Sequence, residues 1–347
     1  MKKWTRREFI PLVGAGLATG SLLAINNSNN EVPGELNIEP RRQHPKKLQA
    51  GDTIGLCASA GALRREAEIS EFSTILQEMG FKVKVGPNVL KKHGYFAGTD
   101  EERASDFMDF IEDTEVNAIF FLRGGWGTAR LINLLDYSKI KDNPKIIMGF
   151  SDVTTLLNSI SKTCNLVTFH GPSGNSSWNA YTRDYIKRVL VNGELVTYKN
   201  KKGDESITTY SPGTATGTLL GGNLSVVTTL IGTPQEPNWM GSILFLEDVM
   251  EEPYSIDRML THLKNAQVLE KVNGVILGNF RKCFAEEPNR SFTLEEVFLQ
   301  HFSNCGKPVY YGAQIGHTVN KYTIPVGVKA TMDAEVGTLQ LLEAAVS

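Results

Sequence analysis

The sequence has few cysteines, no clustered histidines and almost no net charge, and each shortage excludes a class of protein. Four cysteines and six histidines occur among 347 residues, without a CxxC pair or an HExxH motif. A zinc ribbon, a thioredoxin-like site or another metal centre is therefore not expected. The formal charge of −2 comes from 36 basic and 38 acidic residues, which provides no basic face for nucleic acid. We expect no metal, no cofactor and no nucleic-acid partner.

The rest of the composition is that of an ordinary soluble globular protein. Hydrophobic residues make up 41% and charged residues 21% of the chain, which is enough apolar material for a sizeable core. The length predicts two domains.

The amino terminus has the pattern of an export signal. Lys2, Lys3, Arg6 and Arg7 precede the uncharged apolar stretch 12–24, which is too short and glycine-rich to span a bilayer comfortably. The paired arginines before an apolar residue resemble a twin-arginine signal. We therefore expect export to the periplasm or the cell exterior, with a membrane attachment only if this leader stays uncleaved. The alternative is a basic start to a core helix.

The remaining chain divides into a leader, a linker and two domains. We place the signal at 1–25, a polar linker at 26–46, an α/β domain at 47–172, a polar connection at 173–212 and a second domain at 213–347. In the first domain, short apolar runs alternate with helical patterns, which predicts a parallel sheet covered by helices on both faces. The predicted strands are 52–58, 81–85, 118–122 and 146–150, and the predicted helices are 66–79, 100–111, 128–135 and 153–162.

Ser151 is the first candidate nucleophile. It lies in Gly149-Phe-Ser-Asp-Val153, between an apolar strand and a helix, where the helix dipole and free backbone N–H groups favour developing negative charge. The segment resembles a nucleophile elbow but lacks the second glycine of GxSxG. The alternative is that Ser151 simply caps the helix.

A glycine-rich loop ends the preceding predicted strand, with the sequence Arg123-Gly-Gly-Trp-Gly127. Ligands of parallel sheets bind at the carboxyl ends of the strands, where this loop and Ser151 both lie. Glycines let the backbone approach a ligand and leave N–H groups for an oxyanion. The alternative is a plain tight turn.

A serine nucleophile needs a base and a residue that orients the base. Glu247 follows the apolar run 243–246, and His317 follows the apolar run 309–313. Both are polar residues near predicted strand ends, although spacing alone does not select them over His170 or Asp248. A backbone-bonded loop histidine and a solvated strand end remain the alternatives.

Taken together, the motifs resemble the LD-carboxypeptidase family of serine peptidases, the muramoyltetrapeptide carboxypeptidases. Examples are Arg123-Gly-Gly-Trp-Gly-Thr-Ala-Arg130, Gly149-Phe-Ser-Asp152 and Leu246-Glu-Asp248. The matching stretches run in family order and are 51–55, 95–100, 123–130, 149–152, 170–172, 221–224, 246–248, 254–258 and 316–318.

This resemblance implies a catalytic triad and a fold. Ser151 matches the nucleophile, His317 the general base and Glu247 the residue that orients it. Backbone N–H groups of Asp152 and of the Gly124-Gly125 loop would form the oxyanion hole. The implied fold is an amino-terminal parallel α/β domain like that of class I glutamine amidotransferases and a carboxy-terminal domain with β-structure, with the active site between them. A homodimer is also implied.

The implied substrate is a murein tetrapeptide, which loses its terminal D-alanine through an acyl-enzyme. Its free carboxylate needs a cationic or N–H-rich pocket, for which Arg123 and Arg130 are candidates. Trp126 either packs on the peptide or covers the domain interface.

Two other functions remain open at this stage. The family also includes hydrolases of microcin C-type aminoacyl nucleotides, but those toxins act inside the cell, whereas the leader predicts export. A non-catalytic muropeptide-binding protein is the third hypothesis, and the presence of serine, glutamate and histidine at the three matching positions argues against it.

Overall fold

The computed structural model describes residues 42–201, 203–204 and 206–347, so the predicted leader lies outside the described residues. Within these residues the strands form two sheets, which confirms the predicted fold class of a parallel α/β domain followed by a domain with β-structure. None of the helices in this part of the chain has the length and apolar character needed to cross a membrane. Its four cysteines, Cys57, Cys164, Cys283 and Cys305, are free thiols.

The first sheet has the strand order β12-β5-β4-β3-β1-β2. All neighbours are parallel except β12 and β5. Its core strands are short and almost wholly buried, as their apolar runs predict. The strands are β1 (Thr53–Cys57), β2 (Lys82–Val85), β3 (Val116–Phe121), β4 (Ile146–Gly149), β5 (Thr168–His170) and β12 (Ile324–Val326).

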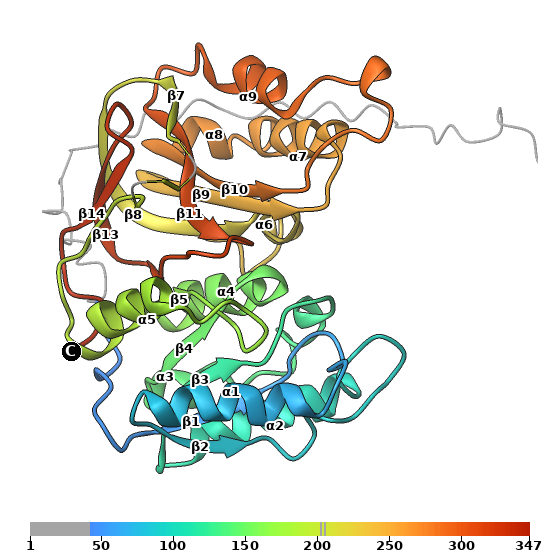
Figure 1. Ribbon diagram of the computed structural model, residues 1–347, viewed down its shortest axis with the longest axis vertical. Helices are drawn as coiled ribbons and strands as arrows, with labels where there is room; N and C mark the ends of the chain where they lie inside the picture. Colours follow the sequence, from blue (N-terminus) through green and yellow to red (C-terminus); the bar gives the residue numbers. More distant parts are fainter. Residues whose placement is uncertain (1–41, 202, 205) are drawn as a thin grey trace, which may run out of the picture. The chain divides into compact units, whose positions relative to one another are not determined.

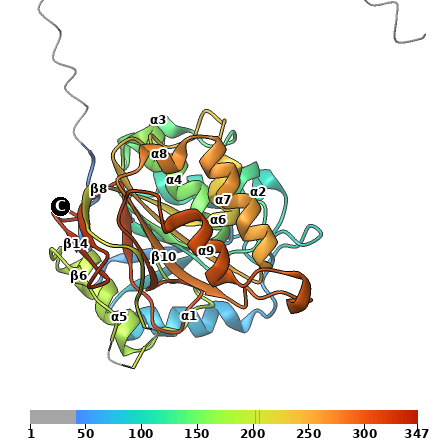
Figure 2. The same ribbon diagram turned by 90° about the horizontal axis from the view of Figure 1, so that it is seen from above.

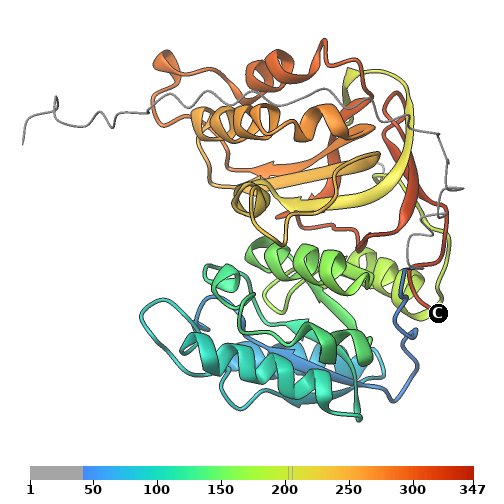
Figure 3. The ribbon, with the colours of Figure 1, turned by 180° about the vertical axis from the view of Figure 1, so that it is seen from behind.

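Helices cover both faces of this sheet. Helix α1 (Ala67–Glu78) lies in front of the strands in Figure 1, and α2 (Asp100–Glu112) lies in front of them in Figure 3, which is seen from behind. Thr99 begins α2 with a capping box, in which its side chain accepts from the Glu102 N–H. The other helices of this half are α3 (Tyr137–Asp142) and α4 (Thr154–Cys164).

One predicted helix is wrong. The range 128–135 forms only a short 3-10 helix, η1 (Thr128–Arg130). The Thr128 N–H donates to the Asp152 carboxylate at 2.8 Å, and Asp136 accepts from the N–H groups of Ser138 and Lys139 to begin α3. These side chains divide the segment, so its apolar pattern does not become a continuous helix.

The second sheet has the order β6-β14-β13-β8-β9-β10-β11-β7. Its four central strands from β8 to β11 are parallel, and the outer strands are antiparallel. The strands are β6 (Thr197–Tyr198), β7 (Thr208–Ser211), β8 (Thr214–Asn223), β9 (Ser242–Val249), β10 (Gly274–Arg281), β11 (Val309–Gly316), β13 (Lys329–Asp333) and β14 (Thr338–Leu341).

Helices α6 and α9 contact this sheet, and α7 packs against both of them. Figure 2 shows α7 and α9 side by side when the protein is seen from above, and the two helices are in contact. The range predicted as a polar connection also contains regular structure, including α5. The helices are α5 (Ala180–Ile186), the π-helix η3 (Lys187–Val191), α6 (Leu224–Leu230), α7 (Pro253–Asn265), α8 (Val268–Lys271) and α9 (Leu294–Phe302).

Buried hydrogen bonds join the two halves at α4. The Asn158 amide on α4 donates to the carbonyls of Thr154 and Gly221, each at 2.9 Å. The Asn223 N–H donates to the Thr154 hydroxyl at 3.1 Å. Since Gly221 and Asn223 belong to β8, the helix that follows Ser151 is tied directly to the second sheet.

Replacing Asn158 by alanine should destabilise the protein. The change leaves the buried Gly221 carbonyl without its donor, which costs about 1–3 kcal/mol of unfolding free energy. Urea denaturation with an unchanged m-value measures this loss. Asn143→Ala is the control, because the Asn143 amide makes only a local bond to the Lys139 carbonyl near the surface. Equal midpoints for the two variants would contradict the assigned role of Asn158.

Candidate active site

Ser151 occupies a strained turn between β4 and α4. Its φ is 60°, a left-handed conformation that costs a non-glycine residue on the order of 1–3 kcal/mol and is concentrated at functional sites. The chain enters the 3-10 helix η2 (Ser151–Val153) here and continues as α4. The cap positions of these helices are Phe150 and Val153, and neither has a side-chain cap. The helix-cap interpretation of Ser151 is therefore wrong, and the turn has the strained geometry of a nucleophile elbow.

The glycine loop after β3 is pressed against this turn. A Cβ on Gly124 would lie 2.8 Å from the Ser151 Cβ, 3.0 Å from its Oγ and 3.5 Å from the Asp152 nitrogen. Gly125 has a φ of 134° and faces Gly61 just as closely. The Gly61 N–H donates to the Gly124 carbonyl at 3.3 Å. Only glycine fits at position 124, and the loop backbone therefore lies beside the Ser151 hydroxyl.

Asp152 holds the carboxy-terminal end of the same loop by a hydrogen bond. Asp152 is 9% exposed, and its carboxylate accepts the Thr128 N–H at 2.8 Å. Burial raises the pKa of Asp152, and the hydrogen bonds from Thr128 and the charge of Arg103 oppose this. The Arg103 guanidinium donates to the carbonyl of Gly127 at 3.1 Å and also to that of Ser59. Sequence reasoning missed this buried arginine, whose only signal was a charged residue in a helical pattern.

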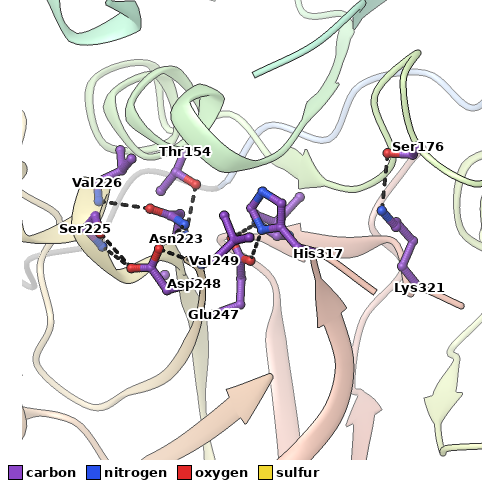
Figure 4. Close-up of polar contacts among 12 residues, drawn as sticks. Thr154, Ser176, Asn223, Ser225, Val226, Glu247, Asp248, Val249, His317 and Lys321 are labelled. Carbon is purple, nitrogen blue, oxygen red and sulfur yellow. Dashed lines mark hydrogen bonds and ion pairs between the residues drawn. The ribbon is translucent and has the colours of Figure 1, made fainter. Parts of the chain in front are cut away.

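Glu247 and His317 meet at the end of the second sheet. The His317 Nδ1 donates to the Glu247 Oε2 at 2.6 Å, as Figure 4 shows. Glu247, near the end of β9, is completely buried, whereas the His317 side chain is 18% exposed. Because Nδ1 carries the shared proton, the neutral ring has Nε2 available as a base.

A second histidine flanks the same carboxylate. The His170 Nε2 lies 3.8 Å from the Glu247 Oε1, which is too long for a hydrogen bond. Burial alone would raise the pKa of Glu247, but the charge of His317, the hydrogen bond from His317 and the charge of His170 outweigh burial and hold this pKa well below its usual range. Glu247 is therefore an anion at neutral pH, as a residue that stabilises an imidazolium must be.

Phe150 connects the nucleophile turn with this pair. Its ring centroid lies 4.8 Å from that of His317 and 6.1 Å from that of His170. Since Phe150 directly precedes Ser151, the structure brings the turn and the Glu247–His317 pair to one place. Among the described residues, the Ser151 hydroxyl has no hydrogen bond to His317; such bonds are often long in unliganded enzymes.

The three residues predicted to bind substrate lie in different surroundings. Arg123 donates to the Ala62 carbonyl at 2.8 Å and lines a surface pocket of about 470 Å³. Arg130 is paired through its Nε with Asp100 at 2.7 Å and lies over the Phe96 ring, and Asp100 is shared with Arg103. Trp126 is 66% exposed and packs edge-on against Tyr95.

Asp248, the other acidic candidate of this strand end, has a structural position. Its carboxylate accepts from the Asn223 amide, from both the N–H and the hydroxyl of Ser225, and from the Val249 N–H (Figure 4). Burial and the neighbouring Glu247 charge raise the pKa of Asp248 to about 6. With these bonds Asp248 holds the end of β9 against α6, and it does not contact His317.

Two family models together cover most of the described chain. The model of the LD-carboxypeptidase N-terminal domain matches residues 54–171, and that of the LD-carboxypeptidase C-terminal domain matches residues 216–332.

Curated relatives are similar over nearly their whole length. A Bacillus subtilis protein named "Probable murein peptide carboxypeptidase" is 37% identical over 308 residues, which is 87% of this chain and 95% of the relative. The Escherichia coli protein named "Microcin C7 self-immunity protein MccF" is 31% identical, over 85% of this chain and 94% of its own length.

Solved structures share the fold. Wild-type unliganded MccF has a TM-score of 0.80 and 27% identity, with 88% of this chain and 100% of that chain covered. The muramoyltetrapeptide carboxypeptidase of Oxalobacter formigenes has a TM-score of 0.71 and 28% identity, with 83% and 97% covered.

Replacing Gly316 by alanine should disable the Glu247–His317 pair. A Cβ at this position would lie 2.1 Å from the Glu247 Oε2, so the carboxylate must move away from the imidazole. A displacement of about 1 Å at such a site can lower the rate roughly 100-fold. Steady-state kcat/KM on a cleaved peptide measures the effect.

Gly306→Ala provides the matched control. Gly306 also has a left-handed φ, 69°, but a Cβ there meets nothing within 4 Å. It should lower stability by about 1–2 kcal/mol and leave kcat/KM unchanged. Equal losses of activity in the two variants would show that backbone strain, rather than the collision with Glu247, is responsible.

Proposed function

The chain belongs to the LD-carboxypeptidase family of peptidases, and on this basis we propose that it releases the terminal D-alanine of murein tetrapeptides as a serine hydrolase. The observation that carries the proposal is the Glu247–His317 hydrogen bond, which lies beside the strained turn of Ser151. The similarity to the murein peptide carboxypeptidase of B. subtilis supports the substrate class.

In the proposed reaction, the Ser151 Oγ attacks the carbonyl carbon of the bond before the terminal D-residue. His317 Nε2 takes the serine proton while its Nδ1 stays bonded to Glu247, whose negative charge stabilises the imidazolium. The same imidazolium then protonates the leaving amine, and water hydrolyses the acyl-enzyme with His317 again as base. Glu247 remains an anion throughout, in keeping with its depressed pKa.

Negative charge on the carbonyl oxygen needs donors fixed in advance. We assign the Asp152 N–H and the backbone of the Gly124–Gly125 loop to this role, because the loop contacts the Ser151 side chain. The bonds from Gly61 to the loop and from the loop to Asp152 keep these groups in place without a substrate.

Ser151→Ala should abolish release of D-alanine from the tetrapeptide L-Ala-D-Glu-diamino acid-D-Ala. Loss of a triad residue lowers kcat on the order of 10⁴-fold or more. Mass spectrometry of the tripeptide product measures this, with thermal unfolding as the control for the fold. Product formation at the unsubstituted rate would exclude Ser151 as the nucleophile.

The similarity to MccF supports a second candidate, the hydrolysis of aminoacyl nucleotides or related amides. A panel that sets the murein tetrapeptide beside an aminoacyl sulfamoyl adenosine separates the two functions by kcat/KM. We propose the peptide as the preferred substrate, because the proposed leader sends the enzyme out of the compartment in which such toxins act.

We propose that Arg6 and Arg7 direct export through a twin-arginine route. Replacing both with lysine should retain the precursor in the cytoplasm, because that route reads the arginine pair. Fractionation followed by immunoblotting measures the distribution, and a Lys2/Lys3→Arg variant is the control. An unchanged distribution would exclude the twin-arginine assignment.

A further inference from the structure

Lys321 places a buried ammonium group beside the candidate active site. The residue lies between β11 and β12 and is only 4% exposed. Its Nζ lies 4.4 Å from the centroid of the Phe150 ring, the residue before Ser151. Figure 4 shows Lys321 on the same stretch of chain as His317, with its Nζ directed at the Ser176 hydroxyl, and that bond is 3.2 Å long.

The hydrogen bonds around Lys321 contain more donors than acceptors. An ammonium has three N–H donors, and a hydroxyl has two acceptor lone pairs and one O–H. The Ser176 hydroxyl accepts from Lys321 and, at 3.1 Å, from the Ser173 N–H. Both of its lone pairs are then used, which leaves its O–H as a further donor. In the described part of the chain, no carboxylate lies within 4 Å of the Lys321 Nζ.

Lys307 shows how this protein satisfies a lysine that needs no ligand. The Lys307 Nζ donates to the carbonyls of Leu269, Glu270 and Val272, at 2.5, 2.5 and 2.6 Å. Lys321 has one hydroxyl and an aromatic face instead. A buried charge without a full set of partners is costly, and burial lowers the pKa of Lys321 to about 8, although the Glu247 charge opposes this.

Ser176 also lies at the edge of a surface pocket. This pocket, of about 470 Å³, is lined by Ser176 and Arg123 and also by Glu68 and Glu71. The Arg123 Nε is buried and has no hydrogen-bond partner within the described residues. The Lys321 ammonium and the Ser176 hydroxyl come from the segments after β11 and β5, and the contact of Lys321 with Phe150 places them beside the Ser151 turn. An anion is the ligand class that accepts from both.

We propose that the Lys321 ammonium and the Ser176 hydroxyl bind the terminal carboxylate of the substrate. The inference rests on the proposed carboxypeptidase function and assigns the group that recognises the free end of the peptide. It replaces Arg130, which is paired with Asp100, as the cation for this role. A bound carboxylate supplies the acceptor that the ammonium lacks, which restricts cleavage to the last residue of a peptide.

Binding without turnover tests this proposal. In the Ser151→Ala background, calorimetry compares the tetrapeptide as the free acid with the same peptide as its carboxy-terminal amide. The acid should bind roughly 10- to 100-fold more tightly, the worth of a charge-assisted hydrogen bond. Adding Lys321→Met should bring this ratio close to one, and Ser176→Ala should lower it partly.

Lys162→Met is the matched control, since Lys162 is an exposed lysine near the end of α4, and it should keep the full ratio. Equal affinity of the acid and the amide before Lys321 is changed would overturn the proposal. A Lys321→Met variant that weakens both ligands equally would also overturn it, by showing a purely structural role. If Lys321→Met does not fold, an unchanged ratio in Ser176→Ala is the overturning result.

Release of D-alanine by the unsubstituted enzyme tests the proposed function independently of the binding experiment. If the unsubstituted enzyme releases no D-alanine, the proposed function fails, whatever the binding ratio is. If D-alanine is released but the ratio does not depend on Lys321 and Ser176, only the assignment of the carboxylate site fails.

Discussion

A carboxylate with no solvent exposure, Glu247, bonded to the imidazole of His317, imposes most of the other requirements of this site. A buried charge must be held by its partners, and here the partners come from several elements. Gly316 leaves room for the carboxylate oxygen, His170 approaches its other side, and the Phe150 ring covers the imidazole. Because Phe150 directly follows β4 of the first sheet and Glu247 belongs to the second, the arrangement exists only when both sheets are packed together. The hydrogen bonds of Asn158 and Thr154 across this contact therefore serve the chemistry as well as the fold.

The parts of the fold that follow from local pattern were predictable, and the parts set by distant contacts were not. The buried strands before Ser151 and the helix after it follow from apolar runs and helical spacing. The range 128–135 was mispredicted because Thr128 donates to Asp152, a bond that no local pattern reveals. Glu247 and His317 are 70 residues apart, so only the family resemblance selected them. Lys321 was missed, since its burial arises from packing against Phe150 and the segment of Ser176.

Several residues of the site lower the free energy of unfolding, and the rest of the protein must offset this loss. Ser151 has a left-handed backbone, Glu247 is an anion without solvent, and Lys321 is a cation with too few acceptors. Each of these lowers stability by itself. All three lie where the two sheets meet, and the surrounding core is buried and continuous. Such local conflicts are typical of functional sites, where strain and unpaired charge keep groups ready for a ligand.

Strand β12 has a consequence for how the chain is made. It pairs with β5 at the edge of the first sheet, although β11 before it and β13 after it belong to the second. The first sheet is therefore incomplete until the ribosome has synthesised residue 326, long after its other strands have emerged. Until then β5 presents an unpaired edge, which is a hazard for aggregation. The first sheet can therefore be completed only after most of the second has been synthesised. Neither sheet is encoded by one uninterrupted stretch of the gene.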